Sequence, residues 1–299
     1  MTKVTIILST YNRCELLSTA IRSIIRQSFT DWRLLVINDG GENVQSVVDQ
    51  FHDIRIEYFN RPHLGKAAQM NFAIRQVQSK YIAYMDDDDE VLPNHLEVLT
   101  DVLEKTGGEF AYSDTDWVLL DEDGKEKIRK VENDRDLSFE DIRIFNYINH
   151  KQILHAKRLS DRIGPYDERL RIFIDFDYIK RLAHECKPIH VNKITGVHYL
   201  RESDQAGQIG SISGLWQRDP FEAGKSLLAF FEKDPEALVK LYWAQNELRL
   251  MADELRREKD AKERAIGELL SSKSWRMTAP LRRFADWFRK CGTRNRGAK

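Results

Sequence analysis

Five apolar or aromatic residues run directly into four carboxylates in the stretch Tyr81-Ile82-Ala83-Tyr84-Met85-Asp86-Asp87-Asp88-Asp89. The apolar part is typical of a buried β-strand, and the acids are expected in a cleft at its end. If the chain stays extended, Asp86 and Asp88 face one way and Asp87 and Asp89 the other. Such packing of like charges is costly without a cation, and oxygen ligands of this kind suit Mg²⁺ or Mn²⁺ holding a phosphorylated substrate. The alternative is a solvated acidic loop.

Similar units precede this stretch, each an apolar, β-branched run followed by a polar loop and a helical pattern. The strands are expected at Val4 to Ser9, Trp32 to Ile37 and Arg55 to Phe59, and a further helix opens at Pro93. Strands that alternate with helices predict an α/β fold with a mostly parallel sheet covered on both faces. Ligands of such sheets bind at the carboxyl ends of the strands, which is where Thr10, Asp39, Gly65 and Asp86 to Asp89 fall.

The pattern changes beyond Phe110 to an expected hairpin, Trp117 to Leu120 and Lys125 to Val131. Residues 1–205 are expected to form the α/β domain. Residues 206–235 are expected to form a loop and helix, of which the loop 206–220 could act as a lid. A charged helix is expected over 236–272, where leucines recur at intervals of seven or fourteen at Leu241, Leu248, Leu255 and Leu269. This helix is either a weak coiled coil that pairs with its own copy or a solvated helix.

The charge of the chain is unevenly distributed. The 299 residues carry a net charge of -1, but the basic tail, residues 273–299, holds nine basic residues against one acid, which leaves -9 for the rest. Its aromatic, amphipathic helix is expected either to lie on an anionic membrane or to dock on the protein, and nucleic acid is disfavoured as a partner. Without about 20 consecutive apolar residues or a signal peptide, the protein is expected in the cytoplasm, peripheral on the inner face of the plasma membrane. Three scattered cysteines predict neither disulfides nor zinc.

Several motifs, taken in order, resemble the GT-A fold, family 2 glycosyltransferases over residues 1–205. They are Val4 to Arg13, Asn38-Asp39-Gly40, Gly65 to Asn71, Met85 to Asp89, and Gly164 to Leu170 followed by Ile174 to Tyr178. The resemblance implies a Rossmann-like sheet with helices on both faces and a C-terminal helical extension. Residues 1–112 would be the nucleotide-sugar half and 113–205 the acceptor half. Ile174 stands where this family usually has Glu.

The family implies an inverting enzyme of the hexosyltransferase type, which moves a sugar from a nucleoside diphosphate sugar to an acceptor hydroxyl. Tyr11 would stack on the base and Asp39 would accept a hydrogen bond from it, while Asp87 would lie near the ribose and Asp88 would bind Mg²⁺ or Mn²⁺. The complete expected donor site is Thr10, Tyr11, Asn12, Asp39, Lys66, Asp86 and Asp87. Alternatively, Tyr11 packs in its loop, Asp39 is a turn residue, and Asp89 caps the following helix.

Asp175 is the expected catalytic base, because an acceptor hydroxyl is a poor nucleophile until a carboxylate takes its proton. Its neighbours Phe173, Ile174 and Phe176 are expected to remove water from it. The alternative is that Asp175 caps a helix from Phe176 to Ala183, in which case Asp177 is the fallback base. Later in the chain, His198, Tyr199 and Arg201 either line the diphosphate or acceptor or are structural.

Two other classes of protein remain as alternatives. A dinucleotide-dependent oxidoreductase is disfavoured, because Thr10-Tyr11-Asn12 stands where GxGxxG would follow the first strand. A non-catalytic, nucleotide-binding scaffold of a polysaccharide assembly complex would differ from the enzyme by lacking turnover. The expected acceptor is a glycan or lipid-linked glycan of bacterial cell-surface polysaccharide or glycolipid synthesis.

Overall fold

The computed structural model describes residues 2–121, 123, 125–132, 136–144, 148–201, 229, 232 and 264. The chain divides into two compact units, Met1–Leu238 and Val239–Lys299. The expected loop and helix (206–235, with the possible lid at 206–220), charged helix (236–272) and basic tail (273–299) lie outside the described residues, apart from the three isolated positions. Within the described part, no helix is both long and apolar enough to cross a membrane.

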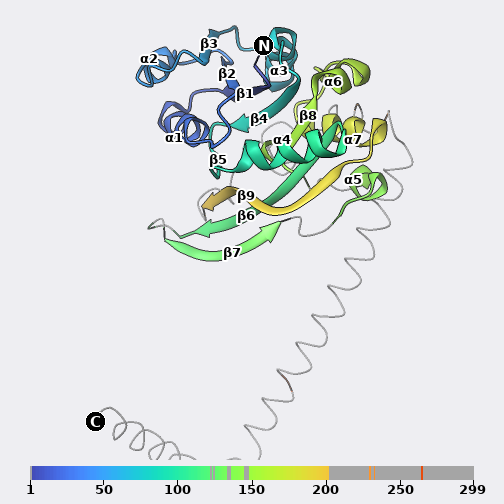
Figure 1. Cartoon of the computed structure of the whole chain (residues 1–299). Coiled ribbons are helices and arrows are strands. Elements are labelled where there is room, and N and C mark those ends of the chain that lie inside the picture. The colour runs from blue at the N-terminus through green and yellow to red at the C-terminus, as the bar shows by residue number, and fades with distance from the viewer. Residues whose placement is uncertain are drawn as a thin grey trace, which may run out of the picture. The chain divides into compact units, whose positions relative to one another are not determined.

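Nine strands of the described chain form one sheet in the order β3-β2-β1-β4-β8-β6-β9-β5, with β7 paired to β6 (Figure 1). They are β1 Val4–Thr10, β2 Trp32–Asn38, β3 Ile56–Asn60, β4 Tyr81–Asp86, β5 Glu90–Val91, β6 Phe110–Leu120, β7 Glu126–Glu132, β8 Ile153–Ala156 and β9 Ile189–Arg201. Strands β1 to β4 are parallel to one another, as predicted. Side chains of β1, β2 and β4 are almost all buried, which fits strands that are covered on both faces.

The second half of the sheet is mixed. Strand β8 is antiparallel to both of its neighbours, β4 and β6, while β9 lies parallel to β6. The predicted hairpin is present as β6 and β7, although β6 begins well before Trp117. The boundary expected at residue 112 falls inside β6, so the two predicted halves share one sheet.

Helices follow most of the strands. They are α1 Cys14–Ile25, α2 Gln45–Asp49, α3 Lys66–Gln76, α4 His95–Thr106, α5 Phe139–Ile144, α6 Lys157–Ile163 and α7 Ile174–Glu185, with a 3₁₀ turn η1 at His150–Gln152. Helix α3 packs on β1 and β2, and α4 packs on β6, β8 and β9. Helix α7 packs against α5 and α6 (Figure 1).

The strand order reverses direction beside β1. The chain moves outward from β1 through β2 to β3 and then returns to place β4 on the other side of β1. At such a point the connections that leave the two neighbouring strands diverge, and in open α/β sheets a crevice forms there at the carboxyl ends of the strands. Thr10 ends β1 and Asp86 ends β4 at this crevice.

Candidate active site

The four acids do not alternate along an extended strand, because β4 ends at Asp86 and the chain then turns. Asp87 and Asp88 instead share one partner, Arg13 Nη1, at 3.1 and 2.9 Å. Asp86 pairs with the Nζ of Lys66 at 2.7 Å, and Asp89 pairs with that of Lys151. The repulsion expected from the sequence is therefore offset by basic side chains of the protein itself.

Lys66 pairs with the acidic turn and also feels the charge of the expected catalytic base. It is the first residue of α3 and follows Gly65, whose φ of 91° favours glycine. Burial would lower the pKa of Lys66, but the charges of Asp86 and then Asp175 raise it above its usual value. Burial likewise would raise the pKa of Asp86, yet the nearby charge of Lys66 holds it below its usual value. Asp175 and the acidic turn thus act on the same ammonium group.

Asp87 and Asp88 differ in exposure. Thr10 Oγ1 donates to Asp87 Oδ2 at 2.7 Å, and burial raises the pKa of Asp87 to about 6 although Thr10 and Arg13 oppose this. The side chain of Asp88 is 43% exposed, and burial together with the charges of Asp86 and Asp89 raises its pKa. Asp88 is therefore an accessible carboxylate with two other acids nearby and one cation, Arg13, paired to it.

The acidic turn fits a divalent cation only in a limited way. Among the described residues, no three His, Cys, Asp or Glu side chains gather around one point as a complete metal site. Asp88 is nevertheless accessible to solvent and chemically suitable. Mg²⁺ and Mn²⁺ commonly take one or two carboxylates and complete their coordination with substrate phosphates and water. The residues present match that incomplete donor set.

Asp89 does not cap the following helix, contrary to one expectation. Helix α4 begins at His95 after Asn94, and Asp89 is instead buried against Lys151. His198 Nδ1 on β9 also contacts Asp89 Oδ1, at 2.8 Å. A buried carboxylate needs such partners, so this pair links the acidic turn to η1 and β9. His198 thus has a structural contact, while Tyr199 beside it is 38% exposed and Arg201 ends the strand.

Asp39 organises the loop before α3. Its Oδ1 accepts hydrogen bonds from Leu64 N–H at 2.9 Å and Gln69 Nε2 at 2.5 Å, and its Oδ2 accepts one from Gly65 N–H at 3.1 Å. His63 Nδ1 lies 3.1 Å from the same Oδ2. Hydrogen-bond donors of the protein therefore occupy the Asp39 carboxylate, as expected if Asp39 is a turn residue. A hydrogen bond from the nucleotide base to Asp39 stays a prediction, and it requires that one of these donors is displaced. Sequence reasoning missed Gln69 and His63, because neither stands out by residue type.

Tyr11 and Asn12 follow Thr10 at the same edge of the sheet. The Tyr11 ring is 44% exposed and stacks on His63, with centroids 4.4 Å apart and planes at 22°. Asn12 has a φ of 53°, and its Oδ1 accepts a hydrogen bond from the Glu42 N–H at 2.8 Å. A Cβ added to Gly41 would overlap that same oxygen. The loops after β1 and β2 are thus tied together beside an accessible aromatic ring.

Asp175 lies in the first turn of α7, which begins two residues earlier than the predicted start at Phe176. Helix α7 begins at Ile174 after Phe173, whose φ of 60° is unusual for a bulky residue. Asp175 is partly buried, and its Oδ1 accepts a hydrogen bond from the Phe176 N–H at 2.9 Å. Asp175 is therefore not the residue before the helix, although it does satisfy a first-turn donor.

The fallback base, Asp177, is built into the protein interior. Its side chain has no exposed surface, and its Oδ2 pairs with the Arg181 Nε at 3.0 Å. A carboxylate held in a buried ion pair cannot reach an acceptor in solvent. The structure therefore removes Asp177 as a candidate base.

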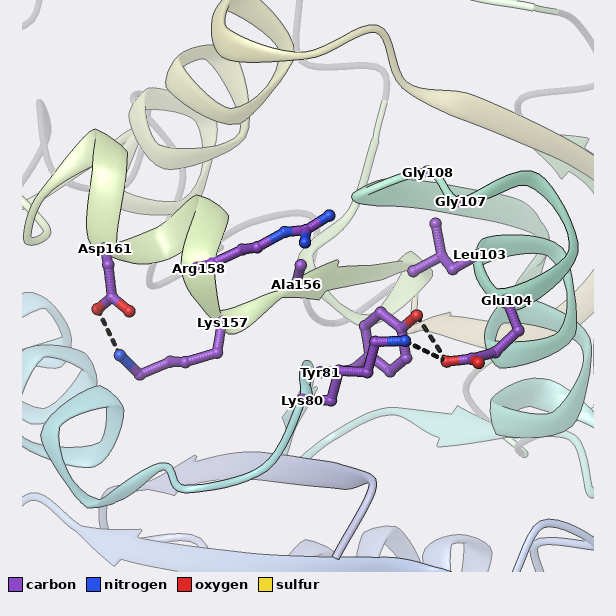
Figure 2. A pocket seen from close by; sticks show the side chains of 10 residues that line it. All are labelled: Lys80, Tyr81, Leu103, Glu104, Gly107, Gly108, Ala156, Lys157, Arg158 and Asp161. Atoms are coloured by element: carbon purple, nitrogen blue, oxygen red, sulfur yellow. Dashed lines mark hydrogen bonds and ion pairs between the residues drawn. The ribbon is translucent and has the colours of Figure 1, made fainter.

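A hollow of about 380 Å³ lies at the other end of β4 (Figure 2). Lys80 and Tyr81 there both donate to Glu104 Oε1 at 2.8 Å, and Lys157 pairs with Asp161. These charged groups are partnered, and the hollow is on the side away from the carboxyl ends of β1 and β4. It contributes nothing to the candidate site.

The model of one protein family, described as glycosyl transferase family 2, matches residues 5–164. The chain belongs to glycosyl transferase family 2. The predicted family is thereby confirmed, and with it the prediction that the protein is a glycosyltransferase.

Similar proteins agree with this assignment. The uncharacterized glycosyltransferase YwdF of Bacillus subtilis is 26% identical over 188 residues, covering 62% of this chain and 69% of YwdF. WfgD of Escherichia coli, a UDP-Glc:alpha-D-GlcNAc-diphosphoundecaprenol beta-1,3-glucosyltransferase, is 32% identical over 36% of this chain and 44% of WfgD. Three relatives from Rickettsia match over 18% to 21% of their own length, so the chain spans a small part of those proteins.

Solved structures support the fold. The mannosyltransferase PcManGT from Pyrobaculum calidifontis, solved with GDP-Man and Mn²⁺, has a TM-score of 0.58 at 17% identity. The similarity covers 92% of this chain and 82% of that protein. The predicted GT-A type of α/β fold is confirmed.

Proposed function

We propose that this enzyme moves a sugar from a nucleoside diphosphate sugar to an acceptor hydroxyl, with inversion at the anomeric carbon and with the help of a divalent cation. The observation that carries the proposal is the junction of β1 and β4. There an accessible carboxylate, Asp88, and two cations, Arg13 and Lys66, lie at the carboxyl ends of parallel strands. Such a place suits a charged diphosphate.

The donor would bind through the loops after β1, β2 and β4. Tyr11 offers an exposed ring for the base, and Thr10, Asn12, Asp39 and Asp87 surround it with polar groups. Lys66 and Arg13 now neutralise carboxylates, and we infer that the diphosphate of the donor takes over part of that pairing. The same two cations would then oppose the charge that grows on the diphosphate as the glycosidic bond breaks.

A divalent cation would be held by Asp88, with Asp86 beside it and with donor phosphates completing the ligand set. The support is the exposed carboxylate of Asp88 beside the charges of Asp86 and Asp89, and the Mn²⁺ in the similarly folded PcManGT. When bound, such a cation supplies Lewis-acid stabilisation of the leaving diphosphate. Oxygen ligands of this kind suit both Mg²⁺ and Mn²⁺.

Asp175 would accept the proton of the acceptor hydroxyl. The freed oxygen attacks the anomeric carbon from the side opposite to the diphosphate, so that the carbon inverts as the leaving group departs. Asp175 is partly exposed in the first turn of α7, and its charge acts on Lys66. In this arrangement Lys66 would face the diphosphate and Asp175 would face the acceptor. A displacement with inversion needs its base on the acceptor side.

The acceptor is proposed to be a glycan or lipid-linked glycan in bacterial cell-surface polysaccharide or glycolipid synthesis. WfgD supports this class, because its name gives a diphosphoundecaprenol-linked sugar as its acceptor. Work on such an acceptor would place the enzyme at the inner face of the plasma membrane.

A thermal-shift screen of nucleotide sugars with and without Mn²⁺ tests the proposal, because a ligand that binds only the folded state raises the unfolding temperature. We expect one donor to stabilise the wild type only with the cation and to turn over with an acceptor. Asp88→Ala should fold and lose the cation-dependent shift, whereas Asp101→Ala, an exposed change on α4, should keep it. Donor binding without turnover would favour the scaffold, and full activity of Asp88→Ala would remove the metal assignment.

A further inference from the structure

Asn71 on the donor-side helix α3 is buried and holds the backbone of Tyr166, a residue 95 positions later. Its Oδ1 accepts a hydrogen bond from the Tyr166 N–H at 2.7 Å, and its Nδ2 donates to the Tyr166 carbonyl at 3.0 Å. The same Nδ2 donates to Glu168 Oε1 at 2.8 Å. One side-chain amide therefore fixes the segment between α6 and α7 through both backbone polar groups of a single residue, Tyr166.

Tyr166 passes this fixed position on to α7. Its ring stacks on Tyr178 with centroids 3.8 Å apart and planes at 6°. Tyr178 lies one helical turn after Asp175, on the same side of α7. Any displacement of Tyr166 therefore moves the start of α7, where Asp175 is held.

Tyr166 is also connected, through His150, to strand β4, which leads into the acidic turn. Its hydroxyl is 2.8 Å from His150 Nε2, and the His150 ring stacks on Tyr84 with centroids 3.8 Å apart. Tyr84 lies in β4, two residues before Asp86. Tyr166 is thus held by α3 through its backbone, by α7 through its ring and by η1 through its hydroxyl.

Helix α3 carries the donor-side contacts on its other residues. Lys66 pairs with Asp86 at its first position, and Gln69 donates to Asp39 one turn later. A second contact between the two sides comes from Arg171, whose Nη1 lies 3.4 Å from the Leu64 carbonyl. The helix is therefore a rigid connection between the donor loop and the segment that leads to Asp175.

We propose that Asn71 is a positioning residue for transfer, which sets the distance between Asp175 and the donor through Tyr166 and α7. This role rests on the proposed function, in which Asp175 is the base. A misplacement of a reacting group by about 1 Å can lower turnover about 100-fold, even when the change lies away from the chemistry. Asn71 itself touches neither Asp86 nor Asp175 in any hydrogen bond, so donor affinity should depend on it little.

Asn71→Asp tests the proposal with nearly unchanged shape. The new carboxylate can still accept from the Tyr166 N–H, but it cannot donate to the Tyr166 carbonyl and it repels Glu168. We expect kcat for transfer to fall about 10-fold or more, while the donor Kd changes less than about two-fold. Adding Glu168→Gln removes the repulsion and supplies an amide donor, so the double variant should recover part of the lost kcat.

Ser79→Ala is the matched control. Ser79 is buried at the amino end of β4 and donates to Thr5 Oγ1 at 2.8 Å, so its loss removes a buried hydrogen bond far from the carboxyl ends of the strands. This variant should keep the wild-type kcat, whatever its unfolding temperature. If Asn71→Asp does not fold, Asn71→Ser, which replaces the amide by a shorter, uncharged hydroxyl, is measured in the same way.

Three results would overturn the positioning role: a wild-type kcat in the folded Asn71 variants, a donor Kd that weakens as much as kcat falls, or no recovery in the double variant. The last would show that the loss is a general effect of destabilisation. Absence of transfer by the wild type with every donor would instead remove the proposed function, so the two failures are distinguishable.

Discussion

At the scale of single residues, Asp175 and Asp177 lie two positions apart and have different surroundings. Asp175→Asn should keep the donor affinity near that of the wild type and lower turnover by about 10² or more, the scale of a lost general base. Donor titration beside initial rates measures both quantities. Collapse of donor binding with intact turnover at saturation would move Asp175 to the nucleotide site.

Asp177→Asn is the informative comparison. Asp177 is fully buried against Arg181, so neutralising it leaves an uncompensated charge inside the protein. Breaking such a pair costs about 3 to 5 kcal/mol of unfolding free energy. The Asp177 variant should therefore lose stability, whereas the Asp175 variant should unfold at nearly the wild-type temperature.

Alanine substitutions at Gly41 and Gly107 distinguish the effect of backbone strain from that of steric overlap. Both have positive φ, 70° and 68°, but a Cβ at Gly41 would overlap Asn12 Oδ1, while one at Gly107 meets nothing within 4 Å. Gly107→Ala should cost about 1 to 2 kcal/mol of stability and leave donor affinity unchanged. Gly41→Ala should also displace Asn12 and weaken donor binding, measured by titration. Equal donor affinity in both variants would show that the Asn12 loop takes no part in the site.

At the scale of elements, the strands around the crevice could be predicted because burial on both faces leaves continuous apolar runs. Strands β1 and β4 end within one residue of their expected positions, at Thr10 and Asp86. The positions of Thr10, Asp39 and the four acids follow from the same reasoning about strand ends, whereas their roles toward a nucleotide sugar come from the family resemblance. Strand β8, only four residues long, gives no such pattern and was not predicted.

The partners of the acids could not be predicted, because they come from distant parts of the chain. Arg13 is 75 residues from Asp88, and Lys151 is 62 residues from Asp89. A buried carboxylate needs charged or hydrogen-bonding partners, but a single sequence does not show which residues lie beside it in space. The start of α7 was misjudged for a local reason, since Phe173 adopts a left-handed conformation that its residue type disfavours.

Strand β8 carries a buried histidine that should make folding sensitive to acid. His155 Nε2 lies 2.8 Å from the Tyr84 hydroxyl, and burial lowers the pKa of His155 to about 4. Between that value and the unfolded pKa of about 6.5, the unfolded chain binds a proton that the folded chain does not, so stability falls as pH falls. His155→Gln should reduce the loss between pH 7 and 5 by about 1 to 2 kcal/mol.

Urea unfolding of the wild type and of His155→Gln at several pH values measures this difference. His52→Asn, a change at an exposed histidine, should leave the pH dependence as it is. If the unfolding free energy of His155→Gln depends on pH as that of the wild type does, other groups cause the acid sensitivity.

At the scale of the whole molecule, membrane binding by the basic tail is predicted from the sequence alone. Residues 273–299 carry nine basic residues against one acid, and each basic residue near an anionic lipid surface contributes about 1 kcal/mol of attraction. Ending the chain after Ser272 should release the enzyme from anionic vesicles and leave transfer to a soluble acceptor intact. Co-sedimentation at low and high salt measures this, and salt should weaken the full-length protein's binding. Equal sedimentation of both forms would mean that the tail binds protein.

The pairing of β5 with β9 sets the order in which a growing chain can complete the site. Glu90 pairs with Val197, and Asp89 contacts His198 across 109 residues of sequence. A ribosome that has released only the first 150 residues has delivered every acid of the turn, but neither Lys151 nor β9. Contacts between such distant segments form late and slowly. The acidic turn therefore waits for 62 more residues of synthesis before the lysine that neutralises Asp89 is added, and the complete site appears only after Arg201 has emerged.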